Sequence, residues 1–454
     1  MVYMKWKIDN IGLFLKRNFK YFLVFLLVIA IYEFFGFGIN YGDPLANYGF
    51  SYAIVKGEIP YLDFNIITTP LYAFYSAFFL LFWNNYLMFI IGQAVLVTLT
   101  FFFLYKLYDK KSYLILAILI GLNFYGILAT YNFMCFSMMV ILIYLEKYHT
   151  DKNYLIGIFI GLAILSKHTI GAFFIFPTLF MYIKNKNFKM VKQRFIGMII
   201  PLIIFFLYLV INGALFSFID LCVLGLFDFS AKNSHPFNVI FYISIILLVI
   251  GIFFTYKKRD VYNYYLLNSF FFLVPIFDYC HFVLFFAAIV MIFLPYLKDG
   301  FYIKMFSIVI IILSLVSSAR SNFKYDLVFT SNYKHFEYNL HVSSEYDRKL
   351  KVMEFLNSYD DAIVLSYFTM QYDIINDNYL DYCDVLLYGN FGYDGINKMI
   401  NRFSTMRNKY FIVSRSDYDN DYEYSQFAKE IVDYVIDNGE FVLSKYGYDV
   451  YYIE

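Results

Sequence analysis

Charged side chains are scarce in this chain, and their scarcity excludes a soluble globular protein. Only 16% of the 454 residues are Asp, Glu, Lys or Arg, whereas 61% are apolar and the mean hydropathy is +0.60. Soluble domains carry about 25% charged residues. Apolar runs of about 20 residues, the length that crosses a ~30 Å hydrocarbon core, recur as far as residue 319 and then stop. The sequence therefore predicts an integral membrane protein.

Cysteine is also rare, which excludes two further classes. The four cysteines lie far apart and form neither a disulfide framework nor a CxxC metal site. The glycines of Gly389-Asn-Phe-Gly392-Tyr-Asp-Gly395 have the wrong spacing for a dinucleotide fingerprint, so this segment is predicted to be a loop. We expect no cofactor and no nucleic-acid partner, and nothing indicates a divalent cation.

Charge divides the chain near Arg320. Residues 320–454 hold 22 of the 35 acidic side chains and 13 of the 36 basic ones, a net charge near −9, which leaves the first 319 residues near +10. Short strand-like and helix-like runs alternate in the acidic part. We therefore predict a membrane domain over 1–319 and a small extracytoplasmic α/β domain over 320–454.

Apolar runs predict a polytopic α-helical membrane domain with about 11–13 transmembrane helices. Basic clusters between the runs mark the cytoplasmic side by the positive-inside rule. The candidate runs, with ends good to a few residues, are 21–37, 66–83, 86–105, 112–128, 131–146, 154–166, 170–183, 195–212, 238–256, 261–277, 281–297 and 302–319.

The two ends of the chain constrain how many of these runs cross. Five bases ahead of residue 21, with no cleavage site after the first run, predict an uncleaved anchor that starts in the cytoplasm. Twelve crossings would return the tail to the cytoplasm, whereas the basic loops place it outside. One run must therefore be re-entrant, broken or miscounted, and the candidates are 66–83 and 154–183, the second of which is interrupted by Ser166, Lys167 and His168.

Acidic residues of the membrane domain fall into two groups, apart from Glu33, which lies inside the first run and belongs clearly to neither. One group, Glu146 among them, lies beside basic loops and is predicted to be solvated on the cytoplasmic side. The other group falls on outer segments, where a carboxylate beside hydrocarbon is costly and seldom without a function. Its members are Asp43, Glu58, Asp63, Asp220, Asp228 and Asp278.

The first external loop, 38–65, holds three of these outer acids. Asp43 is followed by Pro44, which predicts a helix start with Asp43 as its N-cap. A carboxylate at that place can also accept a proton from a bound hydroxyl. The two roles are compatible.

Three segments resemble the GT-C glycosyltransferases, in particular the bacterial family 39-type, protein mannosyltransferase-like and lipid A sugar transferase-like branches. The first external loop, with Gly57-Glu-Ile-Pro-Tyr-Leu-Asp-Phe64 and then Thr69-Pro-Leu-Tyr72, resembles theirs. Gly161-Leu-Ala-Ile-Leu-Ser-Lys-His168 resembles their Gly-Leu-Ala-x-Leu-Thr-Lys turn, and Asp278-Tyr-Cys-His-Phe282 their late His-Phe signature. Here the first-loop Asp precedes Pro rather than a second acid, so a two-carboxylate metal site is not indicated.

The resemblance implies a multi-pass enzyme of the cell membrane that moves one sugar from a polyprenyl-phosphate carrier to a cell-envelope acceptor, whether glycan, lipid or protein, on the outer face. It implies Asp43 as general base and a substrate-binding role for Asp63. The second external loop, 213–237, would close over the site. The remaining substrate-binding candidates are Glu58, Lys167, His168, His281, Asp278, Asp228, Lys232 and His235.

Each candidate also has a purely structural explanation. Lys167 could reach the membrane interface, Asp278 and His281 could form a structural pair, and Asp228, Lys232 and His235 could be ordinary loop residues. Two other functions also fit a membrane protein with outer acids. They are a transporter or flippase of a lipid-linked saccharide and a non-catalytic membrane-anchored envelope protein.

Overall fold

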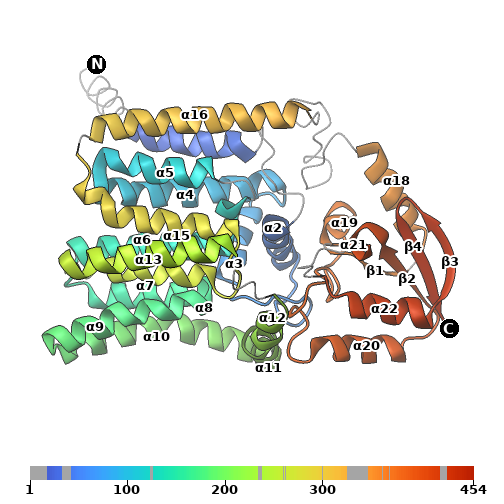
Figure 1. The fold of residues 1–454 in the computed structure, drawn as a ribbon. Helices are drawn as coiled ribbons and strands as arrows, with labels where there is room; N and C mark the ends of the chain where they lie inside the picture. Colours follow the sequence, from blue (N-terminus) through green and yellow to red (C-terminus); the bar gives the residue numbers. More distant parts are fainter. Residues whose placement is uncertain are drawn as a thin grey trace, which may run out of the picture.

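The protein consists of a bundle of apolar helices and a smaller α/β domain at one end of it (Figure 1). The chain is thus a polytopic membrane protein with a small C-terminal α/β region, as the composition predicts. The computed structural model describes residues 18–32, 42–122, 126–233, 238–258, 260, 262–298, 300–324, 346–359, 361–367, 369–419 and 427–454.

Helices of the membrane body vary widely in length. Among the described residues, four apolar helical stretches are long enough to cross a membrane, Tyr86–Gly121, Phe188–Ile211, Val239–Lys257 and Tyr279–Tyr296. Shorter apolar helices, such as Asn18–Tyr32, pack beside them. In chain order the helices are α2 Gly42–Val55, α3 Leu71–Leu80, α4 Tyr86–Tyr108, α5 Ser112–Gly121, α6 Tyr131–Tyr148, α7 Asn153–Ser166, α8 His168–Gly171, α9 Ile175–Asn185, α10 Phe188–Ile211, α11 Leu215–Phe218, α12 Gly225–Asn233, α13 Val239–Lys258, α14 Asn263–Asn268, α15 Tyr279–Phe293 and α16 Gly300–Lys324.

Helix α3 accounts for the run 66–83, and it is too short to cross the membrane. Its ten residues span about 15 Å, half of a ~30 Å hydrocarbon core. The hydroxyl of Tyr72 donates to Gln93 Oε1 (2.8 Å) and that of Tyr75 to the carbonyl of Gly92 (2.7 Å), so α3 packs along the first turns of α4.

The interruption at Lys167 is present in the structure. Lys167 has an extended backbone (φ −153°, ψ 101°) between α7 and α8. A Cβ on Gly171 would lie 2.3 Å from the carbonyl of Ala163, so the chain after the break packs directly against α7. The break thus places Lys167 at a turn, within the body rather than at the end of a continuous span.

Glu146, at the end of α6, corrects one of our expectations. It is not a solvated loop charge, because its side chain is 3% exposed and forms two hydrogen bonds with Arg194 of α10 (2.5 and 3.0 Å). Tyr265 of α14 also donates to it (3.0 Å). Gly157 and Gly197 bring the backbones of α7 and α10 into contact beside this ion pair, since a Cβ on Gly157 would lie 2.0 Å from the Arg194 carbonyl. The Glu146–Arg194 ion pair thus links α6, α10 and α14, beside the place where α7 packs closely on α10.

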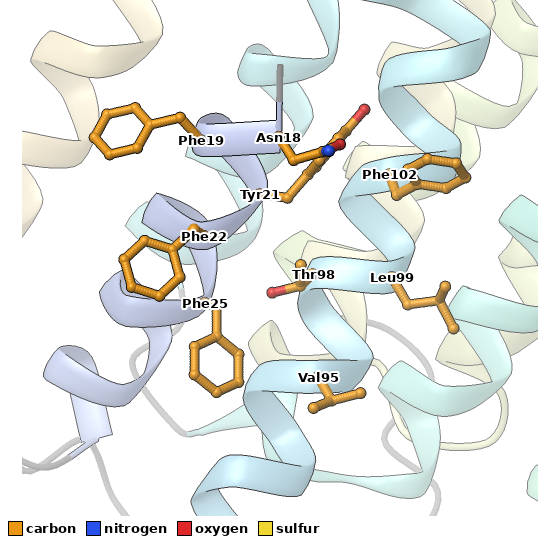
Figure 2. Close-up of a pocket in the computed structure, with 9 residues that line it drawn as sticks. All are labelled: Asn18, Phe19, Tyr21, Phe22, Phe25, Val95, Thr98, Leu99 and Phe102. Carbon is orange, nitrogen blue, oxygen red and sulfur yellow. The ribbon is translucent and has the colours of Figure 1, made fainter. Parts of the chain in front are cut away.

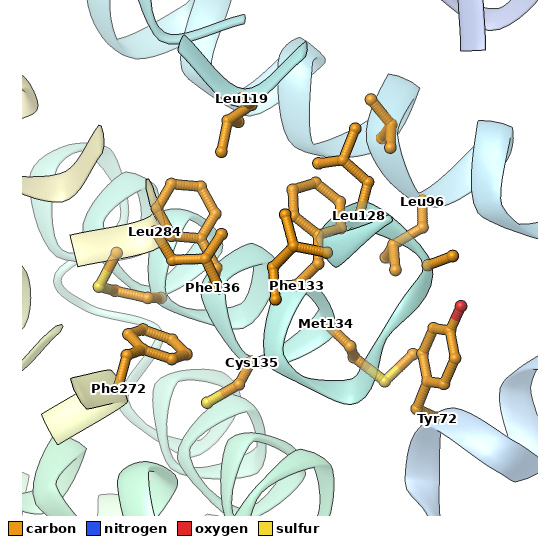
Figure 3. Packing of buried hydrophobic residues seen from close by; sticks show 14 of the residues in the cluster. Tyr72, Leu96, Leu119, Leu128, Phe133, Met134, Cys135, Phe136, Phe272 and Leu284 are labelled. Carbon is orange, nitrogen blue, oxygen red and sulfur yellow. The ribbon is translucent and has the colours of Figure 1, made fainter. Parts of the chain in front are cut away.

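The apolar core and the outer surface of the body are both aromatic. Phe133 and Phe136 of α6 lie at the centre of the core, with Phe272 and Leu284 around them (Figure 3). Large apolar side chains cover the outside of α10, α13 and α16, as expected for helices that face lipid. A groove of about 570 Å³ separates the helix Asn18–Tyr32 from α4 on that surface, and phenylalanine side chains line much of it (Figure 2).

The C-terminal domain is a four-stranded sheet with order β1-β2-β4-β3, in which β1 and β2 are parallel and the other neighbours antiparallel. The apolar faces of α20 and α22 pack on the sheet. The strands are β1 Ile363–Leu365, β2 Lys409–Ser414, β3 Glu440–Lys445 and β4 Tyr448–Ile453, and the helices are α18 Tyr346–Asn357, α19 Met370–Ile375, α20 Gly395–Thr405, α21 Arg415–Tyr418 and α22 Lys429–Asn438.

Candidate active site

Asp43 lies in the first turn of α2, a helix that lies between the membrane body and the C-terminal domain (Figure 1). The helix begins at Gly42, so Asp43 is a residue of its first turn and not the N-cap that we expected. The positive end of the helix dipole still favours a carboxylate there. The Asp43 carbonyl accepts a hydrogen bond from the Asn47 side chain (2.6 Å), as expected for a residue within the helix.

The Asp43 side chain is exposed and yet surrounded by other protein groups. Asp43 is exposed to solvent, yet desolvation by the surrounding protein raises the pKa of its carboxyl group. His281 and Lys167 lower this pKa and Asp278 raises it. The carboxylate therefore lies within electrostatic reach of three of the other predicted site residues, and we call these four side chains the Asp43 cluster.

Lys167 points into the protein rather than toward the membrane interface. Its side chain is buried, and Nζ donates to Asn132 Oδ1 at 2.7 Å. The ammonium also lies 5.5 Å from the centre of the Tyr131 ring. The extended backbone at Lys167 directs this cation toward the start of α6, so the contacts are those of a built polar site.

Asp278 and His281 form a local pair that opens α15. Asp278 is the N-cap, and its Oδ1 accepts from the backbone N–H of His281 (2.8 Å) and lies 2.7 Å from His281 Nδ1. Asp278 and His281 thus form the structural pair that we considered as an alternative, and this pairing does not prevent a role in the site. The other ring nitrogen, Nε2, faces Asn132 Nδ2 at 3.4 Å. If the amide donates there, the imidazole carries its proton on Nδ1 and donates it to Asp278.

Asn132 is the residue that our sequence reasoning missed. It bridges Lys167 and His281, which come from helices more than 100 positions apart in the chain. The available signal was a polar amide two residues after Thr130, the N-cap of α6, in an otherwise apolar run. The amide links the separate motifs into one chain of contacts, Asp278–His281–Asn132–Lys167.

Two predicted residues of the first external loop lie apart from this cluster. Glu58 is buried, and its Oε1 accepts the backbone N–H of Leu380 in the C-terminal domain (2.9 Å). Asp63 is exposed, and its Oδ2 accepts the N–H of Ile59 (2.6 Å), which closes a local turn. His168 begins α8, and neither of its buried ring nitrogens has a hydrogen-bond partner among the described residues.

The predicted residues of the second external loop also contact the C-terminal domain. Asp228 accepts the N–H of Asp394 (2.6 Å), and Lys232 pairs with Glu430 (3.4 Å). Nearby, Gly389 and Gly392 have positive φ angles (83° and 80°), and a Cβ on either would collide with α12 or with Asp220. The predicted glycine loop is therefore a docking loop. His235 lies outside the described residues.

Burial of Glu58 makes the docking of the domain sensitive to pH. Desolvation raises the pKa of Glu58 to about 7, against the lowering effect of the hydrogen bond from Leu380. The folded protein thus binds a proton that the unfolded chain releases near pH 4.5, so its stability falls as pH rises from about 4.5 to 7.

We expect Glu58→Gln to remove this loss, which is about 1–2 kcal/mol after allowance for solvent screening. The measurement is the melting temperature of the purified protein between pH 4.5 and 7.5. Glu354→Gln, an exposed glutamate of α18, is the matched control and should keep the wild-type slope. Parallel curves for wild type and Glu58→Gln would contradict the prediction.

Comparisons with known proteins find a shared fold. No family model and no curated protein matches the sequence. Two solved structures of ArnT from Cupriavidus metallidurans match with 10% identity. The one bound to undecaprenyl phosphate has a TM-score of 0.58 over 96% of this chain and 98% of that chain, and the apo structure 0.55 over 100% and 98%.

Nearly complete coverage of both chains includes the C-terminal domain as well as the bundle. At 10% identity the likeness concerns the arrangement of helices and strands, and it transfers no residue roles. It agrees with the resemblance that the three motifs indicate. The chain therefore has the fold of the GT-C glycosyltransferases.

Proposed function

We propose that this protein is a membrane glycosyltransferase that moves a single sugar from a polyprenyl-phosphate carrier to an acceptor of the cell envelope on the outer face. One observation carries the proposal. Asp43, on α2, lies within electrostatic reach of the contact chain Lys167–Asn132–His281–Asp278, and α2 lies where the helical body meets the polar domain (Figure 1). A lipid-borne donor and a water-borne acceptor meet at such a place. The undecaprenyl phosphate bound to ArnT, which shares the fold, supports the choice of donor.

Asp43 is proposed as the general base. Its carboxylate accepts the proton of the acceptor hydroxyl while that oxygen bonds to the anomeric carbon and the carbon–phosphate oxygen bond breaks. The sugar passes to the acceptor with inversion, and the carrier leaves as polyprenyl phosphate. A base is effective when its pKa lies nearer the working pH, and the desolvation that raises the pKa of Asp43 acts in that direction.

Lys167 is proposed to hold the phosphate of the carrier, and His281 is proposed to join it in the doubly protonated form, in which the Nε2–H turns from Asn132 to a phosphate oxygen. Negative charge grows on that phosphate as the bond breaks, and a cation held in a buried position stabilises it more than one in water. Asn132 fixes Lys167 and the far side of the His281 ring, and Asp278 fixes the near side. Asn132 and Asp278 thus act as positioning residues.

The other candidates are proposed to shape the site rather than bind substrate. Glu58, Asp228 and Lys232 connect the two external loops to the C-terminal domain. Asp63 closes the turn that follows α2. Such contacts hold the two external loops near Asp43. The sequence alone could not distinguish this role from direct contact with the substrate.

The orientation is proposed with the C-terminal domain outside the cytoplasm. The starts of α10 and α16, next to basic connections, lie at the end of the bundle remote from that domain (Figure 1). Lys110 and Lys111 lie beside Gly300 at the same end. Bases gathered at one end and an acidic domain at the other fit the positive-inside rule.

Lipid profiling of a deletion strain tests the function. Without the transferase, the donor lipid is not consumed, so a polyprenyl phosphate carrying one sugar should accumulate several-fold and disappear when the wild-type gene is restored. Restoration with Asp43→Asn should leave it in place. An unchanged lipid profile would contradict the proposal, and accumulation confined to the inner leaflet would favour a flippase.

A further inference from the structure

The C-terminal domain approaches Asp43 through the segment after β1. Tyr367 lies in this segment, and burial first and the Asp43 carboxylate second raise the pKa of its phenol. Its half-buried ring packs against both the apolar core of the membrane body and that of the C-terminal domain. Tyr367 therefore lies at the junction of the membrane body and the C-terminal domain.

Hydrogen bonds fix both ends of this segment. Asp417 Oδ2 accepts from the Ser366 hydroxyl (2.6 Å) and from the backbone N–H of Tyr367 (2.9 Å). Farther along, Thr369 donates its N–H and its hydroxyl to Asp384 (3.0 and 2.9 Å). The Tyr367 ring also stacks on Phe427, with ring centres 6.4 Å apart. Such fixing is what a side chain needs in order to present one geometry to a ligand.

Contacts with α2 hold the segment next to the helix that carries Asp43. Met370 is buried against Gly49, where a Cβ would meet the methionine sulfur at 2.6 Å. One turn farther along α2, Tyr52 and Lys56 bond to Asp377. Asp43 and Tyr367 are thus carried by two elements that pack together, and their separation is set by the docking of the domain.

The two sides of Asp43 differ in chemistry. Lys167 and His281 approach it from the membrane helices, where a lipid-borne phosphate arrives. Tyr367 approaches from the polar domain, where a water-borne acceptor arrives. A phenol has an apolar face and a hydroxyl that both donates and accepts, which suits a carbohydrate with C–H bonds on its face and hydroxyls on its edge.

We infer that Tyr367 of the C-terminal domain is part of the acceptor site and positions a saccharide hydroxyl against Asp43. This inference rests on the proposed function and deepens it, because it makes the outer domain a component of the active site. It also assigns the acceptor the chemistry of a saccharide.

Transfer kinetics of Tyr367 variants test the inference. The donor is the labelled lipid that accumulates in the deletion strain, and the acceptor is lipid-extracted envelope of that strain, added in increasing amounts. Tyr367→Phe keeps the ring stacking and should raise the half-saturating amount of acceptor about three- to tenfold, the range for one lost hydrogen bond. Tyr367→Ala should raise it further. Binding of undecaprenyl phosphate should stay within about twofold of wild type, since Lys167 and His281 are unchanged.

Tyr452→Phe is the matched control, because it removes a tyrosine hydroxyl of the same domain that bonds to Asn408 at an exposed position. It should behave as wild type. If wild type transfers sugar and both Tyr367 variants show wild-type acceptor dependence, the inference is overturned while the proposed function stands. Weaker binding of undecaprenyl phosphate in Tyr367→Phe would also overturn it. If wild type transfers no sugar, the proposed function itself fails.

Discussion

Asp43→Asn is expected to lower the rate of sugar transfer by at least about 100-fold, because the amide cannot accept the acceptor proton and general-base contributions are roughly 10² to 10⁴ in rate. The change is nearly isosteric, so the contacts among Lys167, Asn132, His281 and Asp278 should persist. Transfer is measured in membranes with labelled donor lipid. Undecaprenyl phosphate should bind to the variant at least as well as to wild type, since the variant lacks a negative charge near the phosphate site.

Asp220→Asn serves as the control for Asp43. Asp220 is another of the acids predicted to lie on the outer face, but it pairs with Lys398 of the C-terminal domain (2.8 Å) and is not part of the Asp43 cluster. A partly exposed ion pair contributes about 1 kcal/mol or less, so transfer should stay within a few-fold of wild type. Equal transfer by Asp43→Asn and wild type would remove Asp43 from the mechanism.

Residues around Asp43 show how far the sequence could predict the site. A charged side chain in or beside hydrocarbon is costly, and this argument identified Asp43, Asp278 and Lys167 one by one from the sequence. In the structure all three lie within electrostatic reach of one another. The same argument could not find Asn132, because an uncharged amide in a span costs little. Nor could it show that Glu58 and Asp228 face the C-terminal domain, since their partners are backbone N–H groups more than 150 positions away.

The fold was predictable in outline for a similar reason. Hydropathy reports the cost of moving a segment into lipid, and it therefore found the helical body and its end near residue 319. It does not report the path of the chain. Residues 66–83 are apolar and yet form only α3, and the run 261–277 forms only the six-residue α14 followed by a 3-10 turn over Ser269–Leu273. Neighbouring helices partly bury both segments. Protein can cover apolar side chains just as lipid does, so an apolar run need not cross the membrane.

Glu146 shows where a prediction from charge failed. Its neighbours in sequence are bases on a loop, so a solvated carboxylate was the expected state. The actual partner, Arg194, lies 48 positions away on α10, and both side chains are almost completely buried. A buried charge tolerates such a place only when it is paired and hydrogen-bonded. Tyr265, Thr178 and Asn153 provide the remaining hydrogen bonds of the pair.

Arg194→Met is therefore expected to destabilise the protein by about 3–5 kcal/mol, because it leaves Glu146 charged and unpaired among apolar helices. The measurement is the unfolding midpoint of the detergent-purified protein. Lys192→Met, an exposed base two residues earlier on α10, is the matched control and should change stability by less than about 0.5 kcal/mol.

A second substitution separates charge from packing. Adding Glu146→Gln to Arg194→Met removes the stranded charge, so most of the lost stability should return. A double variant as unstable as Arg194→Met would mean that the arginine acts by filling space between α6, α9 and α10. A single variant as stable as wild type would show that the ion pair does not hold these helices. In either case the contacts of the Asp43 cluster would remain as described, because they come from other residues, and α6, the helix common to both places, contributes Asn132 at its start and Glu146 near its end.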